Sequence, residues 1–161
     1  QGHRRIACLG DLRSIYTAAE RFAGYLDALG EAGIALEEKL IVHDLHDADV
    51  AESEARALLL RDPTPTALLA TQNIVTVGAI RALRALGKHT SVALVGVDDF
   101  MLADMLEPAV TVVAQDPAAM GELACETLFR RMDGDHSQPA TVAVPTRLII
   151  RGSGEIAPPA S

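Results

Sequence analysis

The chain has 161 residues, of which 49% are hydrophobic and 22% are charged, and its formal net charge is −8. This length and composition predict about one globular domain with a substantial apolar core. The acidic balance, without any run of lysine or arginine, argues against direct binding to nucleic acid or an anionic membrane, and no stretch approaches the roughly 20 apolar residues needed to span a bilayer.

The first expected element is a short apolar strand over 5–9, which Gly10-Asp11 closes. A strongly amphipathic helix should follow over 18–32, with Thr17 and Glu20 forming a capping box at its start. The buried face of this helix is marked by apolar residues at helical spacing: Phe22, Tyr25, Leu26 and Leu29.

The middle of the chain predicts two more strands, each followed by a helix. A strand over 39–43 precedes a helix that Asp49 and Glu52 can cap. Asp62-Pro63 should end this helix, because proline cannot continue the hydrogen-bond ladder. The next strand covers 66–70 and leads into a third helix.

The last third of the chain predicts two strands, over 91–97 and 110–114. A helix over 117–132 follows, with proline in its first turn. A long extended run over 140–150 then ends the fold.

Strand 91–97 is organised as a near-continuous apolar run that stops abruptly at Asp98 and Asp99. Such a run is typical of a strand buried on both faces of a parallel sheet. Because neighbouring side chains of a strand point to opposite sides, at most one of the two carboxylates faces the crevice beyond the strand end. We take Asp98 as that residue and Asp99 as the cap of a short helical segment over 100–106. That both carboxylates simply solvate a loop is the alternative.

Strand and helix alternate five times, which predicts an α/β fold: a parallel sheet with helices on both faces. The commonest order for such a unit is 2-1-3-4-5, with the switch point between strands one and three. In that order the loop 10–15, residues 71–73 and the Asp98-Asp99 pair converge on one crevice. This arrangement predicts a small-molecule site.

Motifs for several kinds of chemistry are missing or misplaced. The turn at Gly10-Asp11 has neither a GxGxxG pattern nor a Walker lysine, and Gly152-Ser153-Gly154 lies in a tail that we do not expect to be held rigidly. The run 43–47, HDLHD, has metal-ligand residue types, but a solvated loop is the favoured interpretation. Cys8 is interpreted as a buried free thiol of a reducing compartment. No acid–base pair for catalysis stands out, so the chain is interpreted as a binding protein without metal or cofactor.

Several motifs in register resemble the LacI/GalR family of bacterial transcriptional repressors. They are GHRRIA at 2–7, ERFAGY at 20–25, PTA at 65–67, GAIRAL at 78–83, VGVDD at 95–99, TVVAQ at 111–115, PTRL at 145–148 and RGS at 151–153. Members of that family join a helix-turn-helix headpiece to a two-lobed sensor that is similar to periplasmic sugar-binding proteins.

The resemblance also implies which residues contact an effector. Arg21 matches the arginine that contacts the effector, Asp98 the first aspartate after the fourth strand, and Gln115 the glutamine of the crossover. Gln72 stands where the family commonly has asparagine, and Asp11 belongs to the same crevice. A helix-surface ion pair for Arg21, and a backbone hydrogen bond at the strand end for Gln115, are the alternatives.

One departure from the family concerns an aromatic position. Leu45 stands roughly where many sugar-binding members carry an aromatic residue, so the resemblance does not imply a stacking platform for a sugar ring here. The effector class that it implies is broad: a sugar, a polyol or a nucleoside.

The resemblance implies the following plan. Residues 1–115 form the second lobe of the sensor, 116–139 a helix of the first lobe, and 140–153 a return strand, while 154–161 form a disordered tail. The helix over 117–132 should either fold back on its own lobe or pack against another copy, since its apolar stripe needs cover.

As a whole, the chain is expected to be the non-enzymatic sensor of a cytoplasmic regulator that binds a small polar effector. It should meet operator DNA only through a missing headpiece, bind no membrane, and form a homodimer through its third helix and the segment 100–106. The alternatives are a lobe of a periplasmic sugar-binding transport protein and, more distantly, an α/β enzyme.

Overall fold

The computed structural model describes residues 1–160. It contains six strands: β1 (Ile6–Leu9), β2 (Ile41–Val42), β3 (Ala67–Ala70), β4 (Ala93–Val97), β5 (Thr111–Ala114) and β6 (Arg147–Ile149). They form one sheet in the order β2-β1-β3-β4-β5-β6. β1 to β5 pair in parallel, which confirms the 2-1-3-4-5 order, and β6 joins antiparallel to β5.

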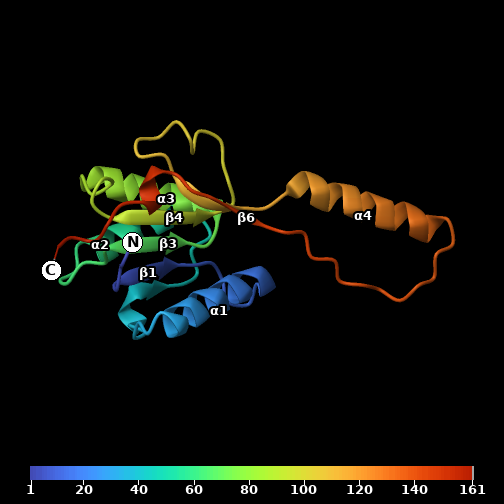
Figure 1. Ribbon diagram of the computed structural model, residues 1–161, viewed down its shortest axis with the longest axis horizontal. Coiled ribbons are helices and arrows are strands. Elements are labelled where there is room, and N and C mark those ends of the chain that lie inside the picture. Colours follow the sequence, from blue (N-terminus) through green and yellow to red (C-terminus); the bar gives the residue numbers. More distant parts are fainter. Residues whose placement is uncertain (161) are drawn as a thin grey trace.

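Helices cover both faces of the sheet, as predicted (Figure 1). α2 (Ala48–Leu59) and α3 (Asn73–Ala85) pack together on one face, over a core cluster of aliphatic side chains that includes Leu9, Leu58, Leu68, Leu94 and Val112. α1 (Tyr16–Glu31) lies on the other face, where Tyr25 and Leu29 pack around Cys8. Burial raises the pKa of the Cys8 thiol to about 12, so this free cysteine stays protonated and unreactive.

The predicted helix caps were wrong for α1 and α2. α1 begins at Tyr16 and has no side-chain cap, so Thr17 and Glu20 do not form a capping box. α2 begins at Ala48, so Asp47 takes the cap position, two residues before the predicted cap Asp49. The Asp47 carboxylate accepts the first free backbone N–H groups, from Asp49 at 2.9 Å and Val50 at 2.8 Å.

A glycine allows α2 and α3 to approach closely. A β-carbon added at Gly78 of α3 would lie 2.6 Å from the carbonyl oxygen of Ala48 and 2.6 Å from the β-carbon of Ala51. Because the carbonyl belongs to the α2 backbone, it cannot move aside as the end of a flexible side chain would. Gly78 is therefore required by the packing of these two helices.

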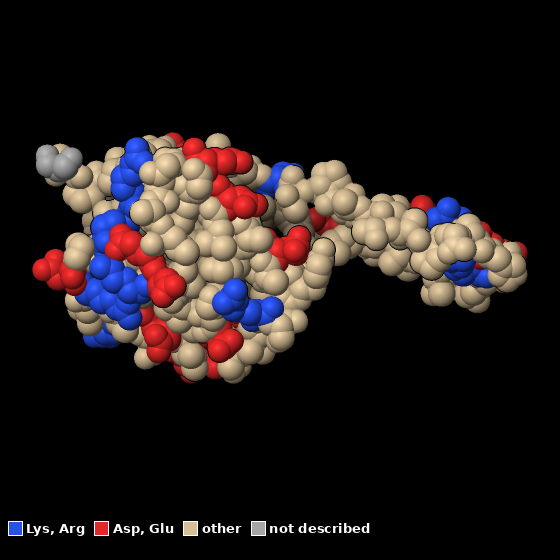
Figure 2. Space-filling model, turned by 90° about the horizontal axis from the view of Figure 1, so that it is seen from below, with Lys and Arg blue, Asp and Glu red and all other residues tan. Residues whose placement is uncertain are grey.

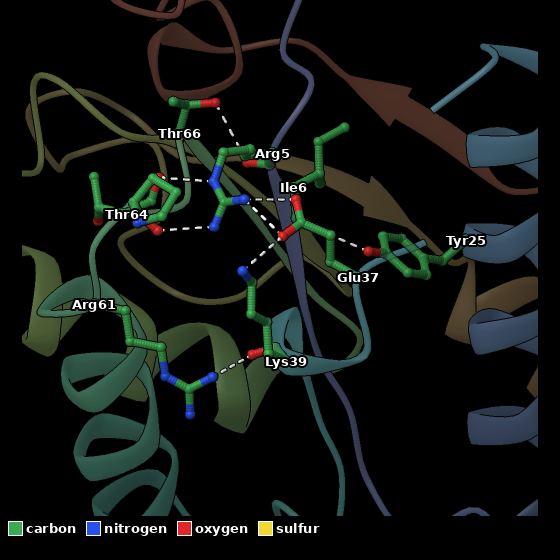
Figure 3. A network of polar contacts seen from close by, with 9 residues as sticks. Arg5, Ile6, Tyr25, Glu37, Lys39, Arg61, Thr64 and Thr66 are labelled. Atoms are coloured by element: carbon green, nitrogen blue, oxygen red, sulfur yellow. Dashed lines mark hydrogen bonds and ion pairs between the residues drawn. The ribbon is translucent and has the colours of Figure 1, made fainter. Parts of the chain in front are cut away.

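A polar network fixes the edge of the sheet at which the parallel strands begin (Figure 3). Arg5 donates to both carboxylate oxygens of Glu37, at 2.5 and 2.7 Å, and to the backbone carbonyl of Pro63 at 2.8 Å. Lys39 adds a second cation 3.1 Å from Glu37. Hydrogen bonds from Arg5 and Lys39 hold the pKa of Glu37 below its ordinary value. Tyr25 donates to the carbonyl of Ile6 at 2.8 Å and ties α1 to β1.

α4 (Pro117–Met132) and the chain that returns from it form an arm that projects from the body of the protein (Figure 1). Asp116 caps the helix by accepting the backbone N–H of Ala119 at 3.0 Å, and none of its residues is buried. Figure 2 shows the arm as mostly uncharged surface between the body and its tip. The exposed apolar side chains of α4 are Met120, Leu123, Leu128, Phe129 and Met132. The helix does not fold back on its own lobe, so of the two predicted arrangements the first was wrong and packing against another copy stays a prediction.

The end of the chain is held more firmly than its composition suggests. Ser153, in the short 3-10 helix η2 (Gly152–Gly154), is buried. Its hydroxyl donates to the carbonyl of Leu94 at 2.6 Å and accepts the backbone N–H of Thr111 at 2.9 Å. Beyond it, the carbonyl of Ile156 lies 2.8 Å from Nε2 of His3. The prediction that the Gly152–Gly154 segment is not held rigidly was therefore wrong, and contacts continue into the expected tail.

Candidate ligand-binding site

The candidate residues meet at the carboxyl ends of the parallel strands. Asp11, Gln72, Asp98 and Gln115 follow β1, β3, β4 and β5 respectively, and Arg21 reaches the same edge from α1. All five are half-buried. Parallel strands end at a common edge, so residues up to 104 positions apart in the chain, from Asp11 to Gln115, gather there.

One part of the site is a pair formed by Asp11 and Gln72. The side-chain amide of Gln72 donates to Oδ2 of Asp11 at 2.6 Å. Gln72 occupies the N-cap position of α3 without capping it by its side chain, which leaves the amide free for this contact. The other oxygen of Asp11 accepts the backbone N–H of Leu12 at 2.7 Å, so the carboxylate is oriented from two sides.

The second part of the site centres on Asp98. Gln115 donates its side-chain amide to Oδ1 of Asp98, and the guanidinium of Arg21 lies 3.8 Å from Oδ2. Arg21 also donates to the backbone carbonyl of Thr71 at 2.8 Å, which links this part to the Gln72 loop. Arg21 thus pairs across elements rather than along its own helix surface, and Gln115 bonds a side chain rather than the strand-end backbone.

The two adjacent carboxylates separate, as predicted for the end of a strand. Asp98 adopts a left-handed backbone conformation, with a φ of 68°, while Asp99 turns away and binds Arg151 through both oxygens, at 2.9 Å each. The hydrogen bonds from Arg151 hold the pKa of Asp99 below its ordinary value. Arg151 belongs to a motif recognised in the sequence, but no signal there predicted a partner 52 positions away.

Asp99 does not cap a helix, and the predicted helical segment over 100–106 is absent from the described chain. Isolated turns stand there instead, closed by hydrogen bonds from Ala103 to Phe100 and from Met105 to Leu102. Leu102 has a φ of 72°, which a right-handed helix cannot accommodate. The Asp99 carboxylate accepts the backbone N–H of Phe100 at 3.1 Å as part of this turn.

The HDLHD run lies beside the site and shows no metal geometry. Within residues 1–160, no group of three or more His, Cys, Asp or Glu side chains is placed to hold a metal ion. Leu45 is buried in the core, so it offers no surface to a ligand. His43 packs edge-on against Phe22 with ring centroids 4.8 Å apart. Partial burial and the nearby Arg13 lower the pKa of His43, which keeps its imidazole neutral at pH 7.

An apolar groove of about 710 Å³ runs along the face of the sheet beside α1. Its walls include aliphatic side chains of the central strands, namely Leu69, Val95, Val97 and Val113. It reaches the candidate site only at Arg21 and Thr71. The polar cluster at the strand ends, rather than this groove, has the hydrogen-bonding groups that a polar ligand needs.

What the cluster can do chemically follows from its groups. The carboxylates of Asp98 and Asp11 accept hydrogen bonds, the guanidinium of Arg21 only donates, and the glutamine amides do both. Such a set suits a ligand with several hydroxyl groups.

None of the helices within residues 1–160 combines the length and apolar character that crossing a membrane requires.

The chain is similar to known regulators along nearly its whole length. HTH-type transcriptional regulator CelR of Thermobifida fusca is 34% identical over 155 residues, which cover 95% of this chain and 46% of that protein. The ribose operon repressor of Haemophilus influenzae is 32% identical over 155 residues, covering 94% of this chain and 46% of that protein. The chain therefore spans about half the length of the curated relatives it matches.

Solved structures agree with the sequence comparisons. The structure of a transcriptional regulator CelR–cellobiose complex matches with a TM-score of 0.87 at 34% identity, over 95% of this chain and 47% of that one. The Escherichia coli transcriptional repressor AscG matches with a TM-score of 0.79 at 34% identity, over 94% of this chain and 56% of that one. A family model described as a periplasmic binding protein-like domain matches residues 1–154. Together with the sheet order described above, these matches show that the chain belongs to the periplasmic binding protein-like domain family, and that it is similar to transcriptional regulators of the LacI family.

Proposed function

We propose that this chain senses a small polyhydroxy effector, a sugar, polyol or nucleoside, at Arg21, Gln72, Asp98, Gln115 and Asp11. The observation that carries the proposal is the set of polar contacts at the strand ends: Gln72 bonds Asp11, Gln115 bonds Asp98, and Arg21 lies 3.8 Å from Asp98. The relatives support the ligand class: CelR is known in complex with cellobiose, and another relative represses a ribose operon.

Each residue has a distinct role in this proposal. Asp98 accepts hydrogen bonds from two ligand hydroxyls, and Arg21 donates to a ligand oxygen while it holds Asp98 and the Thr71 carbonyl in place. Gln115 and Gln72 donate to further oxygens, and Asp11 orients Gln72. Because glutamine is longer than asparagine, the hydroxyl spacing selected at Gln72 differs from that in relatives with asparagine.

The regulator that contains this domain would act on DNA through a separate headpiece and work in the cytoplasm as a dimer. The chain itself has a formal net charge of −8, and Lys and Arg side chains alternate with Asp and Glu on the face drawn in Figure 2. Such a surface does not favour contact with the phosphate backbone. The relatives are transcriptional regulators, which favours this proposal over a transport protein or an enzyme.

A thermal-shift screen tests the proposal. A ligand that binds only the folded chain raises its melting temperature by mass action, so the screen would use cellobiose, ribose, polyols and purine nucleosides at high concentration. We expect at least one compound to raise the melting temperature of the wild type and not of Asp98→Asn. Asp49→Asn, which changes an exposed carboxylate on α2, is the matched control and should keep the response. If no compound acts, or if every response persists in Asp98→Asn, the proposal is wrong.

A further inference from the structure

Arg151 joins two parts of the chain that the sequence keeps apart. Its guanidinium donates from NH1 to Oδ1 of Asp99 and from NH2 to Oδ2, at 2.9 Å each. NH1 also donates to the carbonyl of Val110 at 2.9 Å. Such a two-pronged bond fixes the orientation of a carboxylate as well as its distance. The Arg151 side chain is only 16% exposed, whereas the Asp99 side chain is 36% exposed, so the cation is shielded from water and the carboxylate lies at the surface.

The backbone of Arg151 is itself anchored to β5. Its N–H donates to Oγ1 of Thr111 at 2.9 Å, and the same hydroxyl donates to the carbonyl of Arg151 at 2.6 Å. Two residues further on, the buried hydroxyl of Ser153 bonds β4 at Leu94 and β5 at Thr111. The guanidinium is thus presented from a fixed point of the sheet, although it lies outside any strand.

Asp98 lies directly before the residue that Arg151 binds. Its backbone is left-handed, with a φ of 68°, which aspartate adopts more readily than most residues but which is still less favourable than a right-handed or extended backbone. On one side, the Asp98 N–H donates to the carbonyl of Val113 at 2.9 Å. On the other side, the chain continues directly into Asp99, and Arg151 donates hydrogen bonds to both carboxylate oxygens of Asp99. The loop beyond Asp99 consists of isolated turns.

We propose that Arg151 is a positioning residue for the candidate site: by holding Asp99 it fixes the turn that aims the Asp98 carboxylate at Gln115 and Arg21. Within the described residues, the Arg151 side chain makes no hydrogen bond or ion pair with any of the five candidate residues; its partners are Asp99 and the carbonyl of Val110. The role in ligand binding rests on the proposed function. The structural part, that Arg151 sets the Asp98–Gln115 contact, does not need a ligand and can be tested without one.

The test uses the NMR signals of the Gln115 side-chain amide in the ¹⁵N-labelled chain. These signals are assigned by their loss in Gln115→Leu, and Asp98→Ala shows where they move when the carboxylate is removed. We expect Arg151→Gln to move the Gln115 signals toward their Asp98→Ala positions while most backbone amide signals stay in place. A role limited to stability would lower the melting temperature and leave the Gln115 signals unmoved.

Two further variants complete the experiment. Asp99→Asn removes the other half of the pair and should move the Gln115 signals in the same direction, which keeps the test decisive if Arg151→Gln fails to fold. Arg81→Gln breaks an ion pair of the same 2.9 Å length, with Asp49, away from the site and should leave them unchanged. If Asp99→Asn keeps the native Gln115 signals, the proposal is wrong. Because no effector is present, this result is separate from the success or failure of the ligand screen.

Discussion

The carboxylate of Asp98 accepts a hydrogen bond from the side-chain amide of Gln115, which lies 17 positions further along the chain. With Arg21 3.8 Å from the second oxygen, both oxygens of Asp98 face donors. Each of these donors can turn to a ligand oxygen, and the carboxylate can accept ligand hydroxyls in their place. Under the proposed function, this pair would hold the donors and the acceptor in place until a ligand takes over their hydrogen bonds.

This arrangement predicts that Asp98→Asn weakens effector binding by about 1.5–3 kcal/mol, because the neutral amide of asparagine accepts weaker hydrogen bonds than the charged carboxylate of aspartate. Asp99→Asn should cause a smaller loss, since the Asp99 carboxylate faces Arg151 rather than the cluster. Isothermal titration with the compound found in the screen measures both. Loss of binding in Asp99→Asn together with unchanged binding in Asp98→Asn would reverse our assignment.

Asp99 should also make stability depend on pH. Its pKa in the folded chain is held below the ordinary value, chiefly by the hydrogen bonds from Arg151. The charged carboxylate therefore stabilises the fold above the unfolded-state pKa, and this contribution is lost as the pH falls through the folded-state pKa. Melting temperatures from about pH 6 down to about pH 3 should show the difference between wild type and Asp99→Asn shrinking toward acid. A difference that stays constant over this pH range would contradict the prediction that the charge of Asp99 stabilises the fold.

Gly78→Ala should destabilise the chain by about 1–3 kcal/mol, because the new methyl group would meet the backbone of α2 at 2.6 Å. Gly24→Ala is the matched control, since a β-carbon there meets nothing within 4 Å. In that exposed helical position alanine should stabilise by about 0.5–1 kcal/mol. Urea unfolding of both variants measures the contrast. Equal stability of the two would mean that α2 and α3 can separate freely.

Ser153→Ala should cost about 1–3 kcal/mol, because it leaves the buried carbonyl of Leu94 and the N–H of Thr111 without the serine hydroxyl. Ser14→Ala, at an exposed position, should have little effect. Denaturant titration compares the two. If they are equally stable, the hydroxyl of Ser153 does not hold the chain end to the sheet.

Self-association is expected through α3 and the loop over 100–106. Ile74, Met101 and Met105 are 40%, 86% and 74% exposed, an apolar surface that a partner copy would cover. Light scattering should show a dimer, and Met101→Glu with Met105→Glu should convert it to monomers. Met132→Glu changes a 71% exposed methionine on α4 and should leave the dimer intact. A monomeric wild type contradicts the prediction, and dissociation by Met132→Glu would assign the association to the arm instead.

Much of the fold follows from local sequence patterns. The apolar runs and their alternation with amphipathic helices predicted the parallel sheet, and the commonest order of such units matched the observed order of β1 to β5. α4 has the predicted bounds, and the proline in its first turn marks its start. The helix caps were harder to predict than the strands. Both Asp47 and Asp49 can cap α2, and which of them does so depends on where the first turn begins. The segment 100–106 failed as a helix because of one left-handed residue, Leu102, which helical spacing does not reveal.

The site was predictable to the extent that strand ends must meet. Asp11, Gln72, Asp98 and Gln115 each follow a strand, so the topology brings them together once the order is known. Ser153 and Arg151 were missed as structural residues, because their partners Leu94, Thr111 and Asp99 lie 42 to 59 positions away and only the folded sheet makes them neighbours.

The pairing of β5 with β6 has a consequence for the arm. Ala114 is paired with Arg147 in an antiparallel ladder, so the chain leaves the body and re-enters it at adjacent points. The arm is topologically an insertion into a β-hairpin. Joining Gln115 to Thr146 through an Asn-Gly turn, which suits a two-residue hairpin, should therefore excise the arm and leave a trimmed lobe that folds alone and retains the Asp98–Gln115 contact.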